Sequence, residues 1–322
     1  MCMRSAILVV ALAGFATVSA KAQTFPDRQI TIVVPFAAGG PTDLVARVLA
    51  EKLAPRLGHA VIVENRAGAG GDIGGQAVAK TAPDGHTLLL STTGSLTVNR
   101  HLKLNPDYDP LRDFKPISLA FKTDHVVVVK KDLRVQTLTK LIADMKAEPG
   151  KLNYGSAGLG TTSHMIAELF KAKAGVDMKH VPYRGAGPAL NDLIAGHIDV
   201  MVDSLANSLS QIQAGTVRAL AVTGTTRHPA LPDVPTTKET GGADFSAFAW
   251  GALLAPPNTP DVIVDRLSRE VRSIYEDMGT ARRLAAVGAD AIASSPKELS
   301  EFMAADTEQW GRLIRDAGIK LQ

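Results

Sequence analysis

The chain has 322 residues, of which 45% are apolar and 21% are charged, a composition typical of a globular protein large enough for two domains. Its 35 Lys and Arg residues and 32 Asp and Glu residues give a formal net charge of +3. This near balance, without a run of basic residues, argues against binding to nucleic acid.

Residues 1–22 are predicted to be a secretory signal peptide. Arg4 precedes an apolar run, 6–16, which is shorter than the roughly 20 residues that a membrane-spanning helix needs. Small residues follow at cleavage spacing, so we expect cleavage after Ala22, with Ala20 as the second choice. The sequence therefore predicts a protein that is exported.

Removal of this segment changes the charge and the cysteine content. It takes away Arg4 and Lys21 and no acid, which leaves a formal charge of +1, two below that of the whole chain. The single cysteine, Cys2, lies before the apolar run. We therefore expect neither a lipid anchor nor disulfides, and a large domain pair can bury its core without them.

Short runs of β-branched residues alternate with helical periodicity along the remaining chain, which predicts βαβ units and a parallel sheet. The predicted strands are 29–34, 60–64, 87–91, 116–121, 125–130, 152–154, 178–182, 198–203, 217–223 and 248–255. The clearest helix is predicted over 41–57, where Pro41 suits the first turn. Its expected buried face consists of Leu44, Val45, Val48, Leu49 and Leu53. Later in the chain, Met165, Ile166, Leu169 and Phe170 form a matching stripe, and 261–319 predicts three helices.

Two segments predict crossings between domains. A strand pattern is interrupted at 122–124 and resumes at His125, and the stretch 223–248, rich in Thr, Pro and Gly, leads into the last strand. The predicted division is lobe I, residues 23–122 with 248–322, and lobe II, residues 123–247. Two crossing strands allow hinge closure about a ligand that lies at the carboxyl ends of the strands.

A glycine-rich loop follows a short predicted strand in each half of the chain, at 35–43 and at 155–164. The backbone N–H groups of such a turn, with those of the helix that it opens, form an anion site. The segment 155–162 has the glycine spacing of a phosphate loop, but Thr161 stands where the lysine would be. The loop at 35–43 and the glycine-rich segment 66–75 both lack dinucleotide-binding spacing. The two loops therefore predict an anion clamp without a nucleotide cofactor.

Motifs along the whole exported chain resemble one known family. They are PFAAGGPTD (35–43), VENRAGAGG (63–71), DGHTLLL (84–90), YDPLRDFKPI (108–117), NYGSAGLGTTSH (153–164), VPYRGAGPALNDLIAGHIDVMVD (181–203) and RALAVTG (218–224). In this order they resemble the Bug family of extracytoplasmic solute receptors, also called tripartite tricarboxylate transporter substrate-binding proteins, or the TctC-like family. The resemblance implies a type II, Venus-flytrap periplasmic binding protein, each lobe a mixed, mostly parallel sheet flanked by helices. It also implies that the two glycine loops hold a ligand carboxylate, in several members through ordered water.

In lobe I, the resemblance places the first loop at the ligand, with residues Phe36, Ala37, Ala38, Gly39, Gly40, Thr42 and Asp43. The expected donors are the N–H groups near Gly39 and Gly40, because only small residues let an anion approach the main chain. Alternatively these glycines only make a tight turn, and Asp43 is expected to cap its own helix rather than touch the anion. Thr92 and Thr93 offer hydroxyls to the ligand or cap the following helix.

In lobe II, the second carboxylate loop is matched by Ser156, Ala157, Gly158, Thr161, Thr162 and His164. The hydroxyls of Thr161 and Thr162 can donate to the ligand or cap the helix that follows. A protonated His164 in the first helical turn would oppose the helix dipole, so we expect a neutral packing or hydrogen-bonding residue there.

Two later strand ends add candidates, Tyr183, Arg184 and Gly185 after one and Asp203 after the other. Arg184 either pairs with a distal carboxylate of the ligand or lies on the surface. An ionised Asp203 would accept a hydrogen bond from a ligand amine or hydroxyl and repel a second carboxylate. Alternatively it caps the helix that starts at Ser204.

The sequence thus predicts a monomeric periplasmic receptor that binds a small carboxylate, without cofactor or metal, for the permease subunits of a tripartite tricarboxylate transporter. A ligand sensor for a membrane signalling protein is one alternative, and a periplasmic enzyme acting on a carboxylate is another. The eight histidines lack zinc-site spacing, no G-x-S-x-G motif occurs, and no thiol survives cleavage. Ser156 with His164 lacks an evident orienting acid, so an enzyme is disfavoured.

Overall fold

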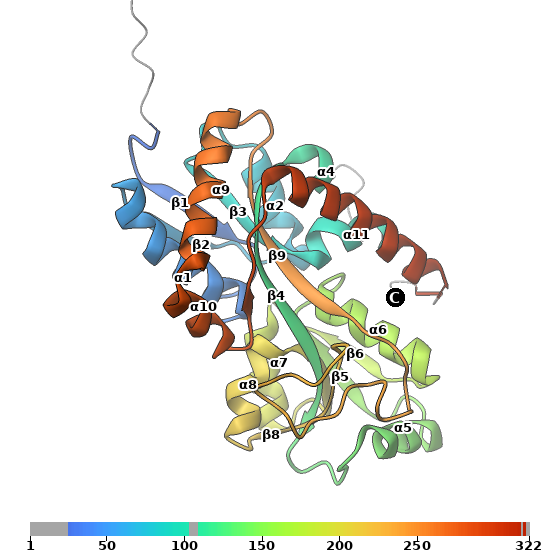
Figure 1. The fold of residues 1–322 in the computed structure, drawn as a ribbon. Helices are drawn as coiled ribbons and strands as arrows, with labels where there is room; N and C mark the ends of the chain where they lie inside the picture. The colour runs from blue at the N-terminus through green and yellow to red at the C-terminus, as the bar shows by residue number, and fades with distance from the viewer. Residues whose placement is uncertain (1–24, 103–108, 317, 320–322) are drawn as a thin grey trace, which may run out of the picture.

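The computed structural model describes residues 25–102, 109–316 and 318–319 and has two α/β lobes, one above the other in Figure 1. The predicted signal peptide, residues 1–22, lies outside the described residues. Among the helices of the described ranges, none combines the length and the apolar character needed to cross a bilayer.

The elements follow one another through the first lobe, into the second and back. The upper lobe in Figure 1 starts with β1 (Ile30–Val34), α1 (Pro41–Leu57), β2 (Val61–Asn65), η1 (Ala69–Gly71), α2 (Asp72–Ala79), β3 (Thr87–Thr92), the π-helical segment η2 (Gly94–Val98), α3 (Asn99–Leu102) and α4 (Pro110–Asp113). The lower lobe is entered along β4 (Lys115–Lys130) and contains α5 (Leu138–Ala147), β5 (Asn153–Ser156), α6 (Thr162–Ala174), β6 (Lys179–Pro182), α7 (Ala186–Ala195), β7 (Val200–Ser204), α8 (Leu205–Gln213) and β8 (Val217–Val222). The chain returns along β9 (Phe248–Ala255) and ends with α9 (Asp261–Glu276), α10 (Met278–Ala285), β10 (Asp290–Ala291) and α11 (Pro296–Asp316).

The strands pair in the order β2-β1-β3-β9-β4-β7-β5-β6, and β8 and β10 also pair with β4. β1 is parallel to β2 and β3, and β5 is parallel to β6 and β7, as the βαβ pattern predicts. β4 is antiparallel to its neighbours and lies beside β9 where the two lobes join (Figure 1). It pairs with β9 from Lys115 to Asp124 and with β7 from His125 onward.

The continuity of β4 corrects one prediction, because no interruption occurs at 122–124. Buried and half-buried residues alternate from Phe121 to His125, with the period of two that a strand requires. The charged residues therefore mark the half-buried face of a strand, where the Lys122 amino group lies 4.6 Å from the ring centroid of Phe248. The other predicted crossing, 223–248, is irregular up to residue 247 and leads into β9 as expected.

The core helices follow the predicted patterns with one exception. α1 has the predicted bounds, and Val45, Leu49 and Leu53 are buried, as is the predicted stripe of α6. Leu44, in contrast, is 37% exposed. It belongs to the first turn of α1, which borders a groove between the lobes instead of packing on the core. The three predicted C-terminal helices are α9, α10 and α11.

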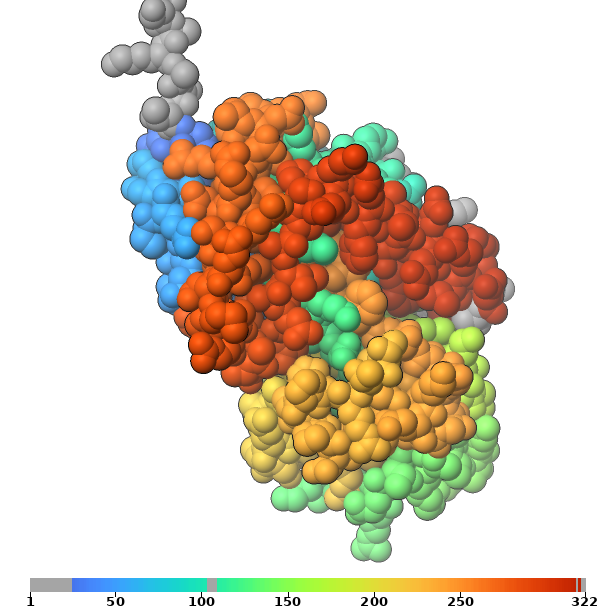
Figure 2. Space-filling model, in the orientation of Figure 1, coloured from blue at the N-terminus to red at the C-terminus, as the bar shows by residue number. Residues whose placement is uncertain are grey.

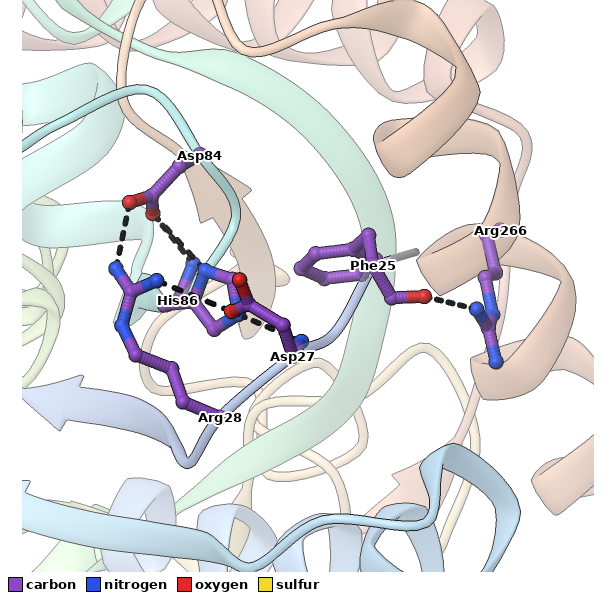
Figure 3. Close-up of polar contacts among 6 residues, drawn as sticks. All are labelled: Phe25, Asp27, Arg28, Asp84, His86 and Arg266. Atoms are coloured by element: carbon purple, nitrogen blue, oxygen red, sulfur yellow. Dashed lines mark hydrogen bonds and ion pairs between the residues drawn. The ribbon is translucent and has the colours of Figure 1, made fainter. Parts of the chain in front are cut away.

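Polar contacts anchor the segment that leads into β1 (Figure 3). The Arg28 guanidinium donates to Asp84 Oδ2 at 2.7 Å, and Asp84 Oδ1 accepts the His86 backbone N–H at 3.0 Å. Arg266 of α9 donates to the Phe25 carbonyl oxygen. These contacts tie the segment before β1 to the loop before β3 and to α9, and so help to position β1 and the glycine loop that follows it.

An open recess of about 760 Å³ separates the lobes on the face shown in Figure 2. β4 contributes Lys122 and Asp124, the lower lobe contributes 223–230, and α11 contributes Trp310. Green atoms of β4 are visible between the two lobes in this view. The predicted ligand-binding residues are absent from this recess, so the candidate site lies elsewhere between the lobes.

Candidate functional site

A cavity of about 60 Å³ between the lobes collects half of the predicted ligand-binding residues. Those that line it are Phe36, Gly40, Thr42, Asp43, Thr92, Ala157, Thr161, Thr162 and Asp203. Ala37, which belongs to the first predicted loop, also lines it. The remaining lining residues were not predicted: Pro41, Phe121, Thr123, His125, Ser163, Ala186, Ser204 and Ala249. Neither group includes a lysine or an arginine, so any anion here must be held by N–H and hydroxyl groups.

The first glycine loop is held by Asp43. The Gly39 N–H donates to Asp43 Oδ2 at 2.9 Å, so this expected anion donor already has a partner. Burial favours the neutral form of Asp43, but hydrogen bonds from Arg47, Gly39 and Asn65 outweigh it and hold the pKa of this carboxyl below its usual range. Asp43 thus ties the loop to its own helix, while Ala38 and Gly39 face a separate groove outside the cavity.

Helix α1 nevertheless begins at the cavity wall, and no side-chain cap is found there among the described residues. Its N-cap, Gly40, makes no side-chain capping bond, and Pro41 at the first helical position has no N–H. The N–H groups of Thr42 and Asp43 belong to the first turn, where an α-helix supplies no internal acceptor. The first turn of α1 is therefore an uncapped, positive helix end at the cavity wall.

Helix α6 presents a second uncapped end to the same cavity. Its N-cap, Thr161, makes no capping bond and instead donates from Oγ1 to the Gly158 carbonyl oxygen at 2.7 Å. The Thr162 hydroxyl accepts the Gly94 N–H at 2.9 Å from the other lobe. Neither threonine caps α6, so the alternative role suggested for them is wrong, and the first turn of α6 has no side-chain cap within the described ranges.

Ser156, Gly158 and His164 shape the second loop from outside the cavity. Ser156 Oγ lies 2.7 Å from His180 Nε2 and accepts the Gly158 N–H at 3.2 Å. His164 Nδ1 accepts the Gly160 N–H at 3.1 Å, and its ring stacks on that of His180 at 4.2 Å. Burial lowers the pKa of each histidine to about 4, so both are neutral at physiological pH, as expected for His164.

Tyr183, Arg184 and Gly185 also lie outside the cavity. The Tyr183 hydroxyl donates to Asp192 at 2.6 Å. The Arg184 side chain is exposed, in agreement with the surface alternative, but its carbonyl oxygen accepts the Ala37 N–H at 3.3 Å across the lobes. A Cβ at Gly185 would lie 3.0 Å from that of Ala37, so this glycine allows the lobes to approach.

Thr92 and Thr93 differ in position although they are neighbours. Thr92 lines the cavity. Thr93 is fully buried and its Oγ1 accepts the Trp250 N–H at 3.0 Å, which joins β9 to the end of β3. Neither residue makes a side-chain cap for η2, so Thr92 keeps a possible ligand role and Thr93 has a structural one.

Asp203 is fully buried at the end of β7 and lines the cavity. Its Oδ2 accepts the Asn207 side-chain N–H at 2.6 Å and the Ser208 hydroxyl. Its Oδ1 has no hydrogen-bond partner among the described residues. Burial raises the pKa of Asp203 to about 6, against the effect of these hydrogen bonds. Asp203 thus bonds to two side chains in the first turn of α8, whose N-cap, Ser204, makes no side-chain capping bond.

His125 is a cavity residue that sequence reasoning missed. It is 1% exposed, and its Nδ1 has no hydrogen-bond partner within the described ranges. Burial lowers its pKa to about 3, so the ring is neutral. It lies opposite Ser204 in the β4–β7 ladder, one pair away from Val126 and Asp203. The alternation of residues along β4 could have placed His125 on the same face as Phe121 and Thr123. The strand break that we predicted at 122–124 hid this alternation.

The described residues hold no group of three or more His, Cys, Asp or Glu side chains that could bind a metal ion. The cavity instead combines two helix N-termini, hydroxyl groups, two aspartates and a neutral histidine. This set can bind an anion through N–H and O–H donors.

The profile of the tripartite tricarboxylate transporter family receptors matches residues 45–319. The chain belongs to this family. The Bordetella pertussis protein BugT is 37% identical to this receptor over 316 residues, which cover 98% of this chain and 97% of BugT. These relationships confirm the resemblance that the sequence motifs carry.

Solved structures agree with this assignment. The periplasmic binding protein BugD matches the receptor with a TM-score of 0.88 and 37% identity, covering 92% of this chain and all of BugD. The R. palustris protein Rpa4515, solved with adipate, matches with a TM-score of 0.89 and 35% identity, covering 92% of this chain and 99% of Rpa4515. The two-lobed binding-protein fold is thereby confirmed, and the family and these neighbours are solute-binding receptors rather than enzymes.

Proposed function

We propose that this receptor captures a small organic carboxylate between its lobes and delivers it to the membrane subunits of a tripartite tricarboxylate transporter. The observation that carries the proposal is the pair of uncapped helix ends, α1 and α6, at one cavity without a cationic side chain. The adipate bound to Rpa4515 supports a carboxylate as the ligand class.

The proposed ligand contacts come from both lobes. The first-turn N–H groups of α1 and α6 hold the carboxylate, and the hydroxyls of Thr42, Thr92 and Thr162 are near enough to the cavity to assist. Phe36, Ala157 and Thr161 complete the wall. The other predicted residues support the loops or the contact between lobes: Ala38, Gly39, Thr93, Ser156, Gly158, His164, Tyr183, Arg184 and Gly185.

The binding free energy expected from these contacts agrees with this arrangement. A hydrogen bond to a charged group contributes about 1.5 to 3 kcal/mol net, and micromolar affinity corresponds to about 8 kcal/mol. About four such bonds, together with burial of a small organic body, offset the cost of association. No lysine or arginine is required in the clamp.

The proposed lobe boundaries are 23–122 with 248–322 for lobe I and 123–247 for lobe II. The change in β4 pairing from β9 to β7 between Asp124 and His125 supports this division, as does the start of β9 at Phe248. We further propose that the receptor is exported by cleavage after residue 22 and acts in the periplasm, since its relative BugD is a periplasmic binding protein. We also propose that it acts as a monomer.

Calorimetry of the purified receptor with di- and tricarboxylates, acidic amino acids and aromatic acids tests the proposal. We expect at least one carboxylate to bind and to raise the melting temperature. Thr162→Val should weaken that binding about tenfold, since one polar contact is worth about 1.4 kcal/mol. Thr139→Val is the matched control, because Thr139 is an exposed threonine in α5. Binding of only neutral or cationic solutes would refute the proposal.

A further inference from the structure

The loop 157–161 connects β5 to α6, and its residues Ala157 and Thr161 line the candidate cavity. The Gly160 N–H, one residue before the N-cap of α6, donates to His164 Nδ1 at 3.1 Å. His164 is the third residue of α6, so this bond joins the loop to the first turn of the helix. The shape of the loop where it enters α6 therefore depends on a side chain that lies outside the cavity.

His180 holds the start of the same loop from β6. Its Nε2 lies 2.7 Å from Ser156 Oγ, which also accepts the Gly158 N–H at 3.2 Å. The His180 ring stacks on the His164 ring at 4.2 Å between centroids. It also stacks at 4.8 Å on Tyr154, its partner in the β5–β6 ladder. The two histidines thus form one packed unit that is bonded to both ends of the loop.

The bond to His164 requires an unprotonated nitrogen. A backbone N–H only donates, so a proton on Nδ1 would leave the buried Gly160 N–H without its acceptor. Protonation of both rings would place two positive charges in stacked contact. A cation in the first turn of α6 would also oppose the positive end of the helix dipole. The observed loop therefore belongs to the neutral form of both imidazoles.

The charged groups around the pair favour this neutral form. Glu168 of α6 accepts the Tyr154 hydroxyl at 2.5 Å and pairs with Lys171 at 3.0 Å. Lys171 also pairs with Asp177, which precedes β6, at 3.4 Å. Burial lowers the pKa of each imidazole to about 4, the positive charge of Lys171 acts in the same direction, and Glu168 opposes it only at His180.

We propose that His164 and His180 are positioning residues for ligand binding, which as neutral imidazoles hold the loop 157–161 in the shape that the α6 end of the clamp requires. This inference rests on the proposed function, because it takes the first turn of α6 to hold the ligand carboxylate. It adds two side chains that act on the ligand through the loop, and a dependence of ligand affinity on their protonation.

Two substitutions at position 164 separate the hydrogen bond from ring packing. The side-chain oxygen of asparagine can replace Nδ1 as an acceptor, whereas leucine, of similar size, has no acceptor. Calorimetry at neutral pH measures the affinity for the tightest-binding carboxylate. We expect His164→Leu to weaken binding about tenfold, because the loop loses the acceptor of a buried N–H, and His164→Asn to stay within about threefold of wild type.

The same comparison applies to His180. The amide of glutamine can replace Nε2, so His180→Gln should retain wild-type affinity within about threefold, whereas His180→Leu should lose more. His197→Leu is the matched control, since His197 belongs to the same lobe, its side chain is 70% exposed and it lies outside the cavity. It should bind within about twofold of wild type. Melting temperatures show whether each variant is folded under the conditions of the assay.

The pH profile of affinity is a readout that a purely structural role would not change. The double variant His164→Asn with His180→Gln keeps both hydrogen bonds and titrates at neither position. Titration of the ligand itself is common to both proteins and cancels in the ratio of their affinities. This ratio should stay constant from neutral pH to about pH 5, and wild type should bind about twofold more weakly than the double variant at about pH 4, where half of each imidazole is protonated.

The outcomes separate this inference from the proposed function. If the folded His164→Leu and His180→Leu variants bind as wild type, or if the affinity ratio is constant down to about pH 4, the positioning role is refuted while the carboxylate receptor stands. If His164→Asn binds as weakly as His164→Leu, the bond to Gly160 has no part in binding and the role is likewise refuted. If wild type binds no carboxylate, the proposed function fails and this inference fails with it.

Discussion

The Gly94 N–H donates to the Thr162 hydroxyl at 2.9 Å and so joins η2 of one lobe to α6 of the other. A Cβ at position 94 would lie 2.7 Å from the Thr162 backbone nitrogen and 2.8 Å from Thr161 Cα. Backbone atoms cannot move away from such a contact as a flexible side chain can. Glycine at this position therefore allows the lobes to close onto each other.

Gly94→Ala is expected to hold the lobes apart. The clash of the added Cβ raises the free energy of the closed state, so a smaller fraction of the receptor can close. Ligand affinity should fall in proportion to that fraction, by about tenfold or more. Calorimetry measures the affinity, and small-angle X-ray scattering should show that ligand no longer reduces the radius of gyration. Gly187→Ala is the control, since its Cβ would meet only the Ala38 carbonyl oxygen at 3.9 Å. Wild-type affinity in Gly94→Ala would contradict the closure role.

Arg184→Ala should leave ligand affinity within about twofold of wild type, because an exposed arginine away from the cavity adds little. The Arg184 side chain is exposed and only its carbonyl oxygen, which the substitution keeps, contacts Ala37. Titration calorimetry of the variant with the best carboxylate checks this. A tenfold loss would mean that the guanidinium reaches the ligand.

Asp203→Asn should remove a pH-dependent cost to stability. Burial raises the pKa of Asp203 from 3.8 to about 6, so the native state binds an extra proton between these values. The stability contributed by this group is present at low pH and is lost as the pH rises through about 6. Between about pH 4 and pH 7 the variant should gain roughly 3 kcal/mol in unfolding free energy relative to wild type.

Urea unfolding of both proteins across this range measures the difference. Effects of other titrating groups cancel in the comparison when they are unchanged by the substitution. A difference that stays constant with pH would show that the Asp203 carboxyl titrates normally in the native state.

The buried histidines should resist protonation. Burial lowers the pKa of His125 to about 3 and those of His164 and His180 to about 4. Their neutral forms therefore stabilise the fold above the ordinary histidine pKa near 6.5, and this contribution is lost as the pH falls toward 4. In NMR spectra, their ring Cε1–H signals should stay close to the neutral position between about pH 8 and pH 5. A midpoint near 6.5 for any of the three would contradict its neutral, buried state.

Local pattern was sufficient for much of the fold. α1 was predictable at both ends because Pro41 and Gly58 flank an apolar periodicity, and Gly58 adopts the left-handed conformation that ends a helix. The two glycine loops were located for the same local reason. The break in β4 was predicted wrongly because Lys122 and Asp124 are charged, yet they alternate with buried Phe121 and Thr123.

The partners of individual polar groups were less accessible to sequence reasoning. The Gly39 N–H could have bonded to an anion or to Asp43, and only the folded loop decides between them. His125 and Asp203 are far apart in the chain, and their burial at one cavity depends on the pairing of β4 with β7. Tertiary register, which the local pattern does not contain, sets these contacts.

A crystal structure of the receptor with its tightest-binding carboxylate tests the central claim most directly. The account predicts closed lobes, with the carboxylate bound to the first-turn N–H groups of α1 and α6 in the cavity lined by Thr42 and Thr162. A carboxylate bound instead in the recess near Lys122 and Trp310, or on one lobe only, would contradict it.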